Sequence, residues 1–208
     1  MKYLLLTLFA VAGYLAGGLN PAIELSKAVF HEDIRQKGSG NPGFTNFKRV
    51  YGNGAASWAV LLLDMAKTAL PIAVFSSIMA HNYGMWQLSA AAIGFACMLG
   101  HAFPVWYGFK GGKSFIAGFM TVCFTDWRVG LIFLAVFMLL LFTVKYMSVA
   151  SMAATALYPI LLPIFGCGIV TEVFAVCAAA LVIFRHKANI IRLRKGTESK
   201  FSLFGKKK

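Results

Sequence analysis

Acidic residues are scarce in this sequence. Its 208 residues include only 7 Asp or Glu, and all charged residues together make up 13% of the chain. An ordinary soluble domain is about a quarter charged and about half apolar. Here hydrophobic residues supply 59%. This balance excludes a soluble globular enzyme and indicates a multi-span membrane protein, which we expect to form a single domain over residues 1–208.

Cysteine is also rare. The four cysteines all lie within apolar runs, and no two have C-x-x-C spacing: Cys97, Cys123, Cys167 and Cys177. A structural metal site needs clustered ligands, and a disulfide framework is typical of small secreted domains. We therefore interpret the four thiols as small packing residues, and we expect neither a metal nor another cofactor.

Several catalytic motifs are missing. Gly112-Lys113-Ser114 has the end of a nucleotide-binding P-loop, but Tyr107 stands where the first glycine is required. The fifth residue after His101 is Trp106, so the H-x-x-x-x-D motif of acyltransferases with an Asp-polarised histidine is missing. The G-x-S-x-G elbow of serine hydrolases is missing as well.

Long apolar runs are what the chain does contain. A membrane-spanning helix needs about 20 apolar residues. The runs predict an all-α integral membrane protein with seven transmembrane helices, some of them short or broken. They cover residues 3–23, 56–80, 85–103, 115–125, 129–144, 152–165 and 168–184. The stretches 114–126 and 150–165 are short for a full crossing, so five spans are the alternative.

Positive charge is distributed unevenly between the two sides that this topology defines. The polar stretches 24–55, 104–114 and 145–151 and the tail from residue 185 would share one side, with 17 of the 20 Lys and Arg. Cytoplasmic loops carry such an excess, so the N-terminus is predicted outside and the C-terminus inside. Within the tail, residues 188–194 are predicted to form a short helix at the membrane surface. Because the cations lie at the ends of apolar runs, the net charge of +13 does not indicate nucleic acid binding.

Two charged residues fall inside a predicted span. Asp64 and Lys67 are three positions apart on one helical face, so they are expected to pair. Charges at membrane depth usually face a protein interior or a polar cavity. A structural ion pair and a support for the neighbouring loop are both open interpretations. His101, before a Phe-Pro at a helix end, is a candidate either for capping that end or for chemistry.

The polar stretches on the predicted cytoplasmic side are rich in glycine, amides, hydroxyls and cations, and poor in acids. Glycine-rich turns and hydrogen-bond donors in such numbers suit a phosphate-bearing ligand. From the residues alone, three classes remain open: an enzyme, a transporter of small phosphorylated or anionic solutes, and a scaffold that binds anionic lipid.

Three motifs carry a resemblance to a known family. Residues 38–46 (GSGNPGFTN), residues 100–113 (GHAFP with FKGGK) and residues 186–198 (HKANI, RL and GTE) lie in order along almost the whole chain. Together they resemble the acyl-phosphate:glycerol-3-phosphate acyltransferases, the PlsY family. Phe44, Ser114 and Lys187 depart from the residues usual in that family, which are Ala, Gly and Arg.

The resemblance implies an enzyme of bacterial phospholipid synthesis in the inner (plasma) membrane, with its active site facing the cytoplasm. It would transfer a fatty acyl group from acyl phosphate to the 1-hydroxyl of glycerol 3-phosphate, giving lysophosphatidic acid and phosphate. Its partners would be these two substrates and membrane lipid, without nucleic acid, and we expect a monomer. Acyl-CoA and acyl carrier protein would not be donors. A transporter is the alternative.

The same resemblance suggests roles for individual residues. The candidate catalytic residues are Ser39, Ser151, His186 and Asn189. The candidate phosphate-binding residues are Asn41, Thr45, Asn46, Arg49, Lys113 and Lys195. The supporting residues are Gly38, Gly40, Gly43, Asp64, Lys67, His101, Gly111, Gly112 and Glu198. We expect the phosphate of the acyl donor to accept the proton of the attacking hydroxyl, with His186 or His101 as the rival base.

Overall fold

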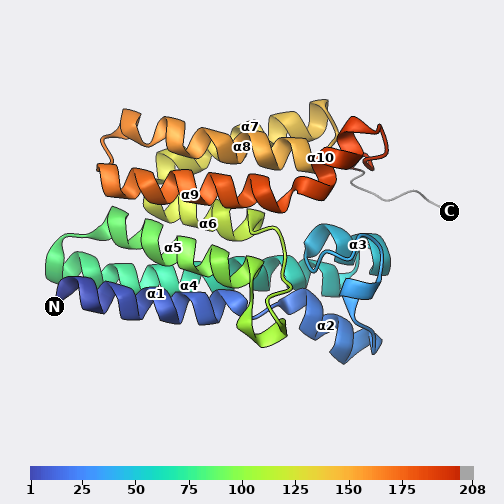
Figure 1. Ribbon diagram of the computed structural model, residues 1–208, viewed down its shortest axis with the longest axis horizontal. Helices are drawn as coiled ribbons and strands as arrows, with labels where there is room; N and C mark the ends of the chain where they lie inside the picture. Colours follow the sequence, from blue (N-terminus) through green and yellow to red (C-terminus); the bar gives the residue numbers. More distant parts are fainter. Residues whose placement is uncertain (202–208) are drawn as a thin grey trace.

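The computed structural model describes residues 1–201, and every regular element in that range is helical (Figure 1). The terminal Lys206, Lys207 and Lys208, which belong to the basic tail, lie outside the described residues. The long axis is followed by α1 (Lys2–Gly18), α4 (Ala55–Tyr83), α5 (Trp86–Ala102), α6 (Phe115–Thr125), α7 (Trp127–Thr143), α8 (Met147–Leu161) and α9 (Ile169–Arg185). The all-α prediction is therefore confirmed.

Three short helices gather at one end of this bundle. They are α2 (Pro21–Phe30), α3 (Phe44–Tyr51) and α10 (Lys187–Arg194). The single-turn helices are η1 (Ile34–Gln36), η2 (Val105–Tyr107) and η3 (Pro163–Phe165). Segments 19–54, 103–114, 144–146 and 186–201 lie at the end with α2, α3 and α10, on the right in Figure 1. We call this the loop end; it unites the polar stretches that the sequence assigns to one side.

Within the described residues, three helical stretches are long and apolar enough to cross a membrane by length and composition. They are residues 2–30, 55–83 and 86–107. Helices α9 and α10 form a fourth if the 53° bend between them is counted within one span. Helices α6, α7 and α8 are apolar but shorter.

The first predicted span differs from the structure. The apolar run predicts a helix that continues through residue 23, but α1 ends at Gly18 and α2 begins at Pro21. Asn20 is the reason, because its Oδ1 accepts a hydrogen bond from the Ile23 amide at 3.1 Å and so caps α2. Proline at the first helical position favours the same start.

Helices α1 and α5 approach each other through glycine. A Cβ on Gly17 would lie 2.3 Å from the Cys97 carbonyl oxygen, and one on Gly100 would lie 2.0 Å from the Tyr14 carbonyl oxygen. Membrane helices use small residues at such contacts because little else drives their association in lipid. The close contact fixes the position of the C-terminus of α1, and with it the point where the segment 19–54 of the loop end begins.

A small hydrophobic core lies beneath the loop end. Ile23, Ile34, Phe47 and Val60 are completely buried there. Phe44 packs against this core, and its ring lies 5.4 Å from that of Trp58. Packing therefore accounts for the phenylalanine at this position of the first motif.

The cysteines are free thiols. Cys97 is buried in the core near Ile93, as predicted. Cys177 is exposed on the outer surface of the bundle, so the prediction that it packs inside the protein is wrong.

Candidate functional site

The Glu198 carboxylate is the centre of a polar cluster at the loop end. Its Oε1 accepts hydrogen bonds from Ser148 Oγ at 2.9 Å and Asn189 Nδ2 at 2.6 Å. Its Oε2 accepts one from Arg192 Nε at 2.7 Å. Burial alone would raise the pKa of Glu198, but these hydrogen bonds outweigh burial and hold the pKa below its usual value. The carboxylate therefore joins the start of α8 to α10.

Lys113 lies near this cluster and has no hydrogen-bond or ion-pair partner among the described residues. Burial lowers its pKa to about 8, and the neighbouring Arg192, Arg49 and Arg185 lower it further, against the opposing effect of Glu198. Three arginines and one carboxylate thus lie close enough to Lys113 to affect its charge. A site with such an excess of positive charge is suited to an anionic ligand.

The loop formed by residues 37–46 is fixed by Asn46. Its Oδ1 accepts a hydrogen bond from the Ser39 amide at 2.8 Å, and its Nδ2 donates to the carbonyl oxygens of Lys37 and Ile34. Asn46 is 1% exposed. The structure corrects its prediction as a phosphate ligand, because the amide is buried and already bonded to the backbone. A Cβ on Gly38, at φ +58°, would lie 2.3 Å from Asn46 Oδ1, so this position needs glycine.

Several candidate ligands on this loop remain available to a substrate. The side chains of Ser39, Asn41 and Thr45 make no hydrogen bond within the described residues. Arg49, on α3, makes one, from Nη2 to Ser199 Oγ at 3.0 Å. The other guanidinium nitrogens of Arg49 are free to bind an anion.

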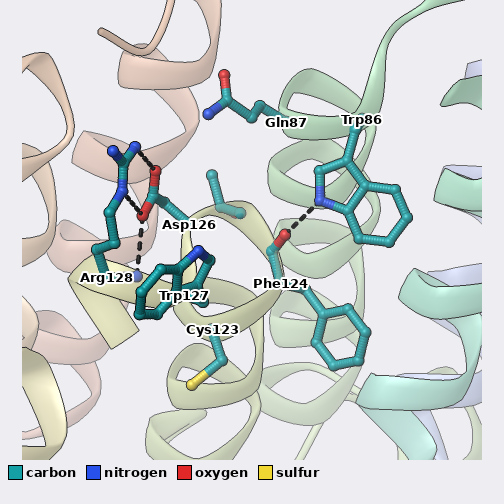
Figure 2. A pocket seen from close by; sticks show the side chains of 8 residues that line it. Trp86, Gln87, Cys123, Phe124, Asp126, Trp127 and Arg128 are labelled. Carbon is teal, nitrogen blue, oxygen red and sulfur yellow. Dashed lines mark hydrogen bonds and ion pairs between the residues drawn. The ribbon is translucent and has the colours of Figure 1, made fainter. Parts of the chain in front are cut away.

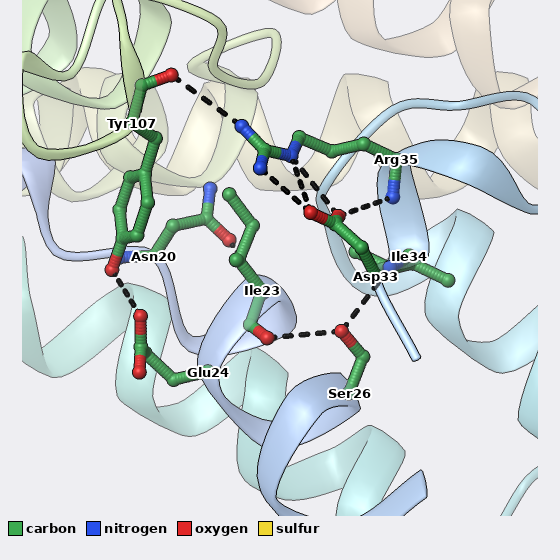
Figure 3. Close-up of polar contacts among 8 residues, drawn as sticks. All are labelled: Asn20, Ile23, Glu24, Ser26, Asp33, Ile34, Arg35 and Tyr107. Carbon is green, nitrogen blue, oxygen red and sulfur yellow. Dashed lines mark hydrogen bonds and ion pairs between the residues drawn. The ribbon is translucent and has the colours of Figure 1, made fainter. Parts of the chain in front are cut away.

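A second network ties this region to the loop after α5 (Figure 3). The Tyr107 hydroxyl donates to Glu24 Oε1 at 2.6 Å, and its carbonyl oxygen accepts from Arg35 Nη1 at 3.4 Å. Arg35 also forms an ion pair with Asp33 at 2.6 Å, and this hydrogen bond lowers the pKa of Asp33. The network holds the α2–η1 segment against the 103–114 loop, so the positions of these two segments depend on each other.

The ion pair predicted within the second span is confirmed. Lys67 Nζ lies 3.0 Å from Asp64 Oδ1 and 2.9 Å from His101 Nδ1, and it donates to the Leu19 carbonyl oxygen at 2.6 Å. Asp64 and His101 are buried. This network joins α4 and α5 to the end of α1, and it engages His101 through a ring nitrogen rather than as a helix cap.

The glycines of the second motif pack directly on His101. A Cβ on Gly111 would lie 2.0 Å from the His101 carbonyl oxygen, and one on Gly112 would lie 2.1 Å from His101 Nε2. Ser114, where the resemblance leads us to expect glycine, has φ +60° and donates from Oγ to the Met98 carbonyl oxygen at 2.7 Å. The left-handed backbone explains why glycine suits this position. In this protein the hydrogen bond offsets the backbone strain that serine has there.

His186 lies in the bend between α9 and α10 and is buried. Its Nδ1 is 2.7 Å from the Val182 carbonyl oxygen. A carbonyl only accepts, so Nδ1 carries the proton, and in the neutral ring Nε2 is left as an acceptor. Lys113 and Glu198 are close enough to His186 to interact with it electrostatically.

Asn189 also presents an acceptor. Its Nδ2 donates to Glu198, which fixes the orientation of the amide. Its Oδ1 is buried without a hydrogen-bond partner. A buried polar atom without a partner is costly, and in a site it indicates a place for a ligand.

The two remaining candidates, Ser151 and Lys195, lie in different environments. Ser151 is buried one turn along α8 from Ser148, and its hydroxyl makes no hydrogen bond within the described residues. Lys195 is exposed after α10, and its side chain makes no hydrogen bond or ion pair within the described range. The sequence places Ser148 in the polar stretch 145–151 and Arg192 in the third motif, but it assigns neither residue, nor Arg185, a role in the site. Ser148 is three residues from Ser151, and Arg192 is three residues from Asn189, so each pair lies on one helical face. This spacing is the sequence signal that could have placed Ser148 and Arg192 in the site.

A pocket of about 400 Å³ lies at the opposite end of the bundle, where α5 begins and α6 is followed by α7. Figure 2 shows the side chains that line it. Two pairs of its polar groups bind each other. Asp126 pairs with Arg128 at 2.6 Å, and Trp86 Nε1 donates to the Phe124 carbonyl oxygen at 2.8 Å. The two charged residues of this pocket are thus paired with each other, whereas Lys113 at the loop end has no partner within the described residues. Within residues 1–201, no group of three His, Cys, Asp or Glu could hold a metal ion.

Comparison with known proteins agrees with this geometry. Residues 7–196 match the family model described as glycerol-3-phosphate acyltransferase. A glycerol-3-phosphate acyltransferase of Brucella anthropi is 37% identical, with 98% of each chain covered. One of Methylorubrum extorquens is 40% identical, covering 94% of this chain and 92% of the relative.

Solved structures are similar as well. One is the crystal structure of PlsY, an integral membrane glycerol 3-phosphate acyltransferase, in its glycerol 3-phosphate form. It superposes with a TM-score of 0.85 at 30% identity and covers 95% of this chain and 96% of that one. The lysophosphatidic acid form gives a TM-score of 0.79 at the same identity, with 95% of each chain covered.

Proposed function

The chain belongs to the glycerol-3-phosphate acyltransferase family, and from this premise we propose that the loop end is its active site. The protein is an acyltransferase that acts on glycerol 3-phosphate, rather than the transporter held as an alternative. The observation that carries the assignment of the site is the unpaired Lys113 beside Arg49, Arg185 and Arg192. This concentration of cations is suited to a phosphate dianion.

The phosphate of glycerol 3-phosphate binds Lys113 and Arg49 in this proposal. Both carry donors free of protein partners, and Arg49 offers two adjacent N–H groups of the kind that bind phosphate in pairs. Ser39 on the neighbouring loop and Thr45 at the start of α3 add neutral donors for the phosphate of the second substrate. Asn41 lies on the same loop and stays a candidate for this role.

The glycerol hydroxyls face the other side of the site. Asn189 Oδ1 and His186 Nε2 are both acceptors without a protein donor, so each can take a hydrogen bond from a hydroxyl. Glu198 orients the amide, and the Val182 carbonyl orients the ring. Ser151, buried on α8 beneath Ser148, stays a candidate for contact with the reacting group.

The acyl donor is acyl phosphate, a lipid anhydride whose chain remains in the membrane. The 1-hydroxyl oxygen of glycerol 3-phosphate attacks the carbonyl carbon, an ester C–O bond forms, and the acyl C–O bond to phosphate breaks. The phosphate leaves with the electron pair and accepts the hydroxyl proton, giving inorganic phosphate. Orientation and stabilisation of negative charge supply the catalysis.

The donor assignment gives a direct expectation. Purified protein should release inorganic phosphate from acyl phosphate only when glycerol 3-phosphate is present, and should form lysophosphatidic acid in equal amount. Release of CoA from acyl-CoA at a comparable rate would overturn the donor assignment and leave the acceptor assignment intact.

The proton acceptor is tested by replacing His186 with Gln. If the leaving phosphate accepts the proton, kcat should fall by less than about a hundredfold, because a lost general base typically costs 10²–10⁴. The pH dependence of kcat should keep its shape, and KM should rise. His101→Gln is the comparison, since that ring is already engaged by Lys67. A loss of about four decades in kcat, with unchanged substrate affinity, would instead make His186 the base.

The distribution of Lys and Arg is the basis for the proposed orientation in the membrane. We propose that α1, α4, α5, α6, α7, α8 and α9 cross the membrane, with the loop end in the bacterial cytoplasm, the N-terminus outside and the C-terminus inside. The concentration of Lys and Arg at the loop end supports this orientation. We propose a monomer, because the site is built from segments of a single chain.

A further inference from the structure

Arg185, the last residue of α9, forms an unusual contact with the backbone. Its Nε donates to the Gly112 carbonyl oxygen at 2.9 Å, and its Nη2 donates to the Gly111 carbonyl oxygen at 2.7 Å. The guanidinium also lies over the Phe103 ring, 5.1 Å from its centroid. No carboxylate pairs with Arg185 among the described residues. Its charge is therefore committed to two successive peptide carbonyls.

Those carbonyls belong to the turn that ends at Lys113. Residues 110–114 have no regular secondary structure of their own. One side of the turn rests on α5, where the Gly112 amide donates to the His101 carbonyl oxygen at 2.9 Å. The other side is held by Arg185 from α9. The direction of Lys113 is thus set from both sides, by α5 and by α9.

We propose that Arg185 is a positioning residue, which clamps the Gly111 and Gly112 carbonyls so that the Lys113 ammonium points at the substrate phosphate. This inference rests on the proposed role of Lys113 as a phosphate ligand. The planar guanidinium presents two N–H groups in a fixed fork, which matches two adjacent carbonyls in a way that an ammonium cannot. Without the clamp, the turn relaxes and the ammonium moves, and small misplacements of a binding group are costly in an active site.

A double-mutant cycle tests the coupling. The dissociation constant of glycerol 3-phosphate is measured calorimetrically for the detergent-purified full chain, for Arg185→Gln, for Lys113→Gln and for the double variant. Arg185→Gln should weaken binding roughly tenfold, and Lys113→Gln should weaken it more. The double variant should bind no worse than Lys113→Gln, because the clamp acts only through the lysine. Arg185→Lys should resemble Arg185→Gln, because the fork is lost although the charge is kept.

The other outcomes overturn the inference in separate ways. Losses that add in the double variant would mean that Arg185 contacts the phosphate itself. Full recovery by Arg185→Lys would mean that only its charge matters. Lower thermal stability with an unchanged dissociation constant would make Arg185 merely structural. If Lys113→Gln alone leaves binding unchanged, the proposed phosphate ligand fails, and the clamp fails with it.

Lys187→Gln is the control: it removes an exposed cation two positions away from Arg185 and should leave binding unchanged.

Discussion

Replacing Lys113 by Gln is expected to lower kcat/KM for glycerol 3-phosphate by roughly thirtyfold to a few thousandfold. Removing one partner of a desolvated, hydrogen-bonded charge pair costs about 2–5 kcal/mol, and each 1.4 kcal/mol is tenfold. Lys113 is expected to form such a pair with the phosphate, because it is half-buried and has no partner within the described residues. Steady-state kinetics measures the effect. A loss under threefold would show that the phosphate binds elsewhere.

The pH dependence gives an independent check on the same residue. The pKa of Lys113 is lowered to about 8, so the charged form, which we propose binds the phosphate, predominates below that pH and is lost above it. The wild-type kcat/KM, which reports the free enzyme, should therefore fall as the pH rises through about 8. Lys113→Arg keeps its charge throughout this range and should show a flatter profile, although its affinity is lower. Identical profiles for the two proteins would exclude Lys113 as the titrating group.

Replacing Gly100 by Val should prevent the protein from folding to a stable bundle. Even a Cβ at this position would lie 2.0 Å from the Tyr14 carbonyl oxygen and 2.8 Å from the Gly18 amide nitrogen. Both are backbone atoms, so the contact is relieved only if α1 and α5 separate. Overpacking a well-packed contact typically costs 1–3 kcal/mol, and we expect at least about 3 kcal/mol because whole helices must move.

The measurement is the half-inactivation temperature in detergent, together with the fraction of monodisperse protein. Gly54→Ala is a matched control, because Gly54 has φ −89° and a Cβ added there would meet no other atom within 4 Å. It should behave like the wild type. Wild-type stability for Gly100→Val would show that α1 and α5 are not packed as closely as the structure has them.

Apolar runs predicted the long helices well because length and hydropathy decide whether a helix suits a bilayer. The predicted spans 56–80 and 85–103 correspond to α4 and α5, and the predicted surface helix 188–194 corresponds to α10. The break after α1 went unpredicted, although Asn20 followed by Pro21 is an ordinary helix-start signal. Hydropathy is averaged over a whole span, so it does not register a helix break that two residues cause.

The site was predicted less completely, because its contacts join residues far apart in the chain. The motif around residues 38–46 indicated a polar loop, but the buried amide of Asn46 holds that loop together, which only the folded backbone reveals. Likewise, the contact of Arg185 with Gly111 joins positions 74 residues apart. Sequence patterns supply the residue types of a site, whereas tertiary packing decides which of them are left free to bind.

The position of Glu198 also bears on when the enzyme becomes active during its synthesis. Its carboxylate links Ser148 to Asn189 and Arg192, so the segment that follows α10 completes the polar cluster. A nascent chain that has inserted its earlier helices still lacks the assembled polar cluster that we propose as part of the active site. Acyl transfer would then begin only after translation has passed residue 198 and the last helix has joined the bundle. Premature termination within this segment would yield an inserted but inactive protein.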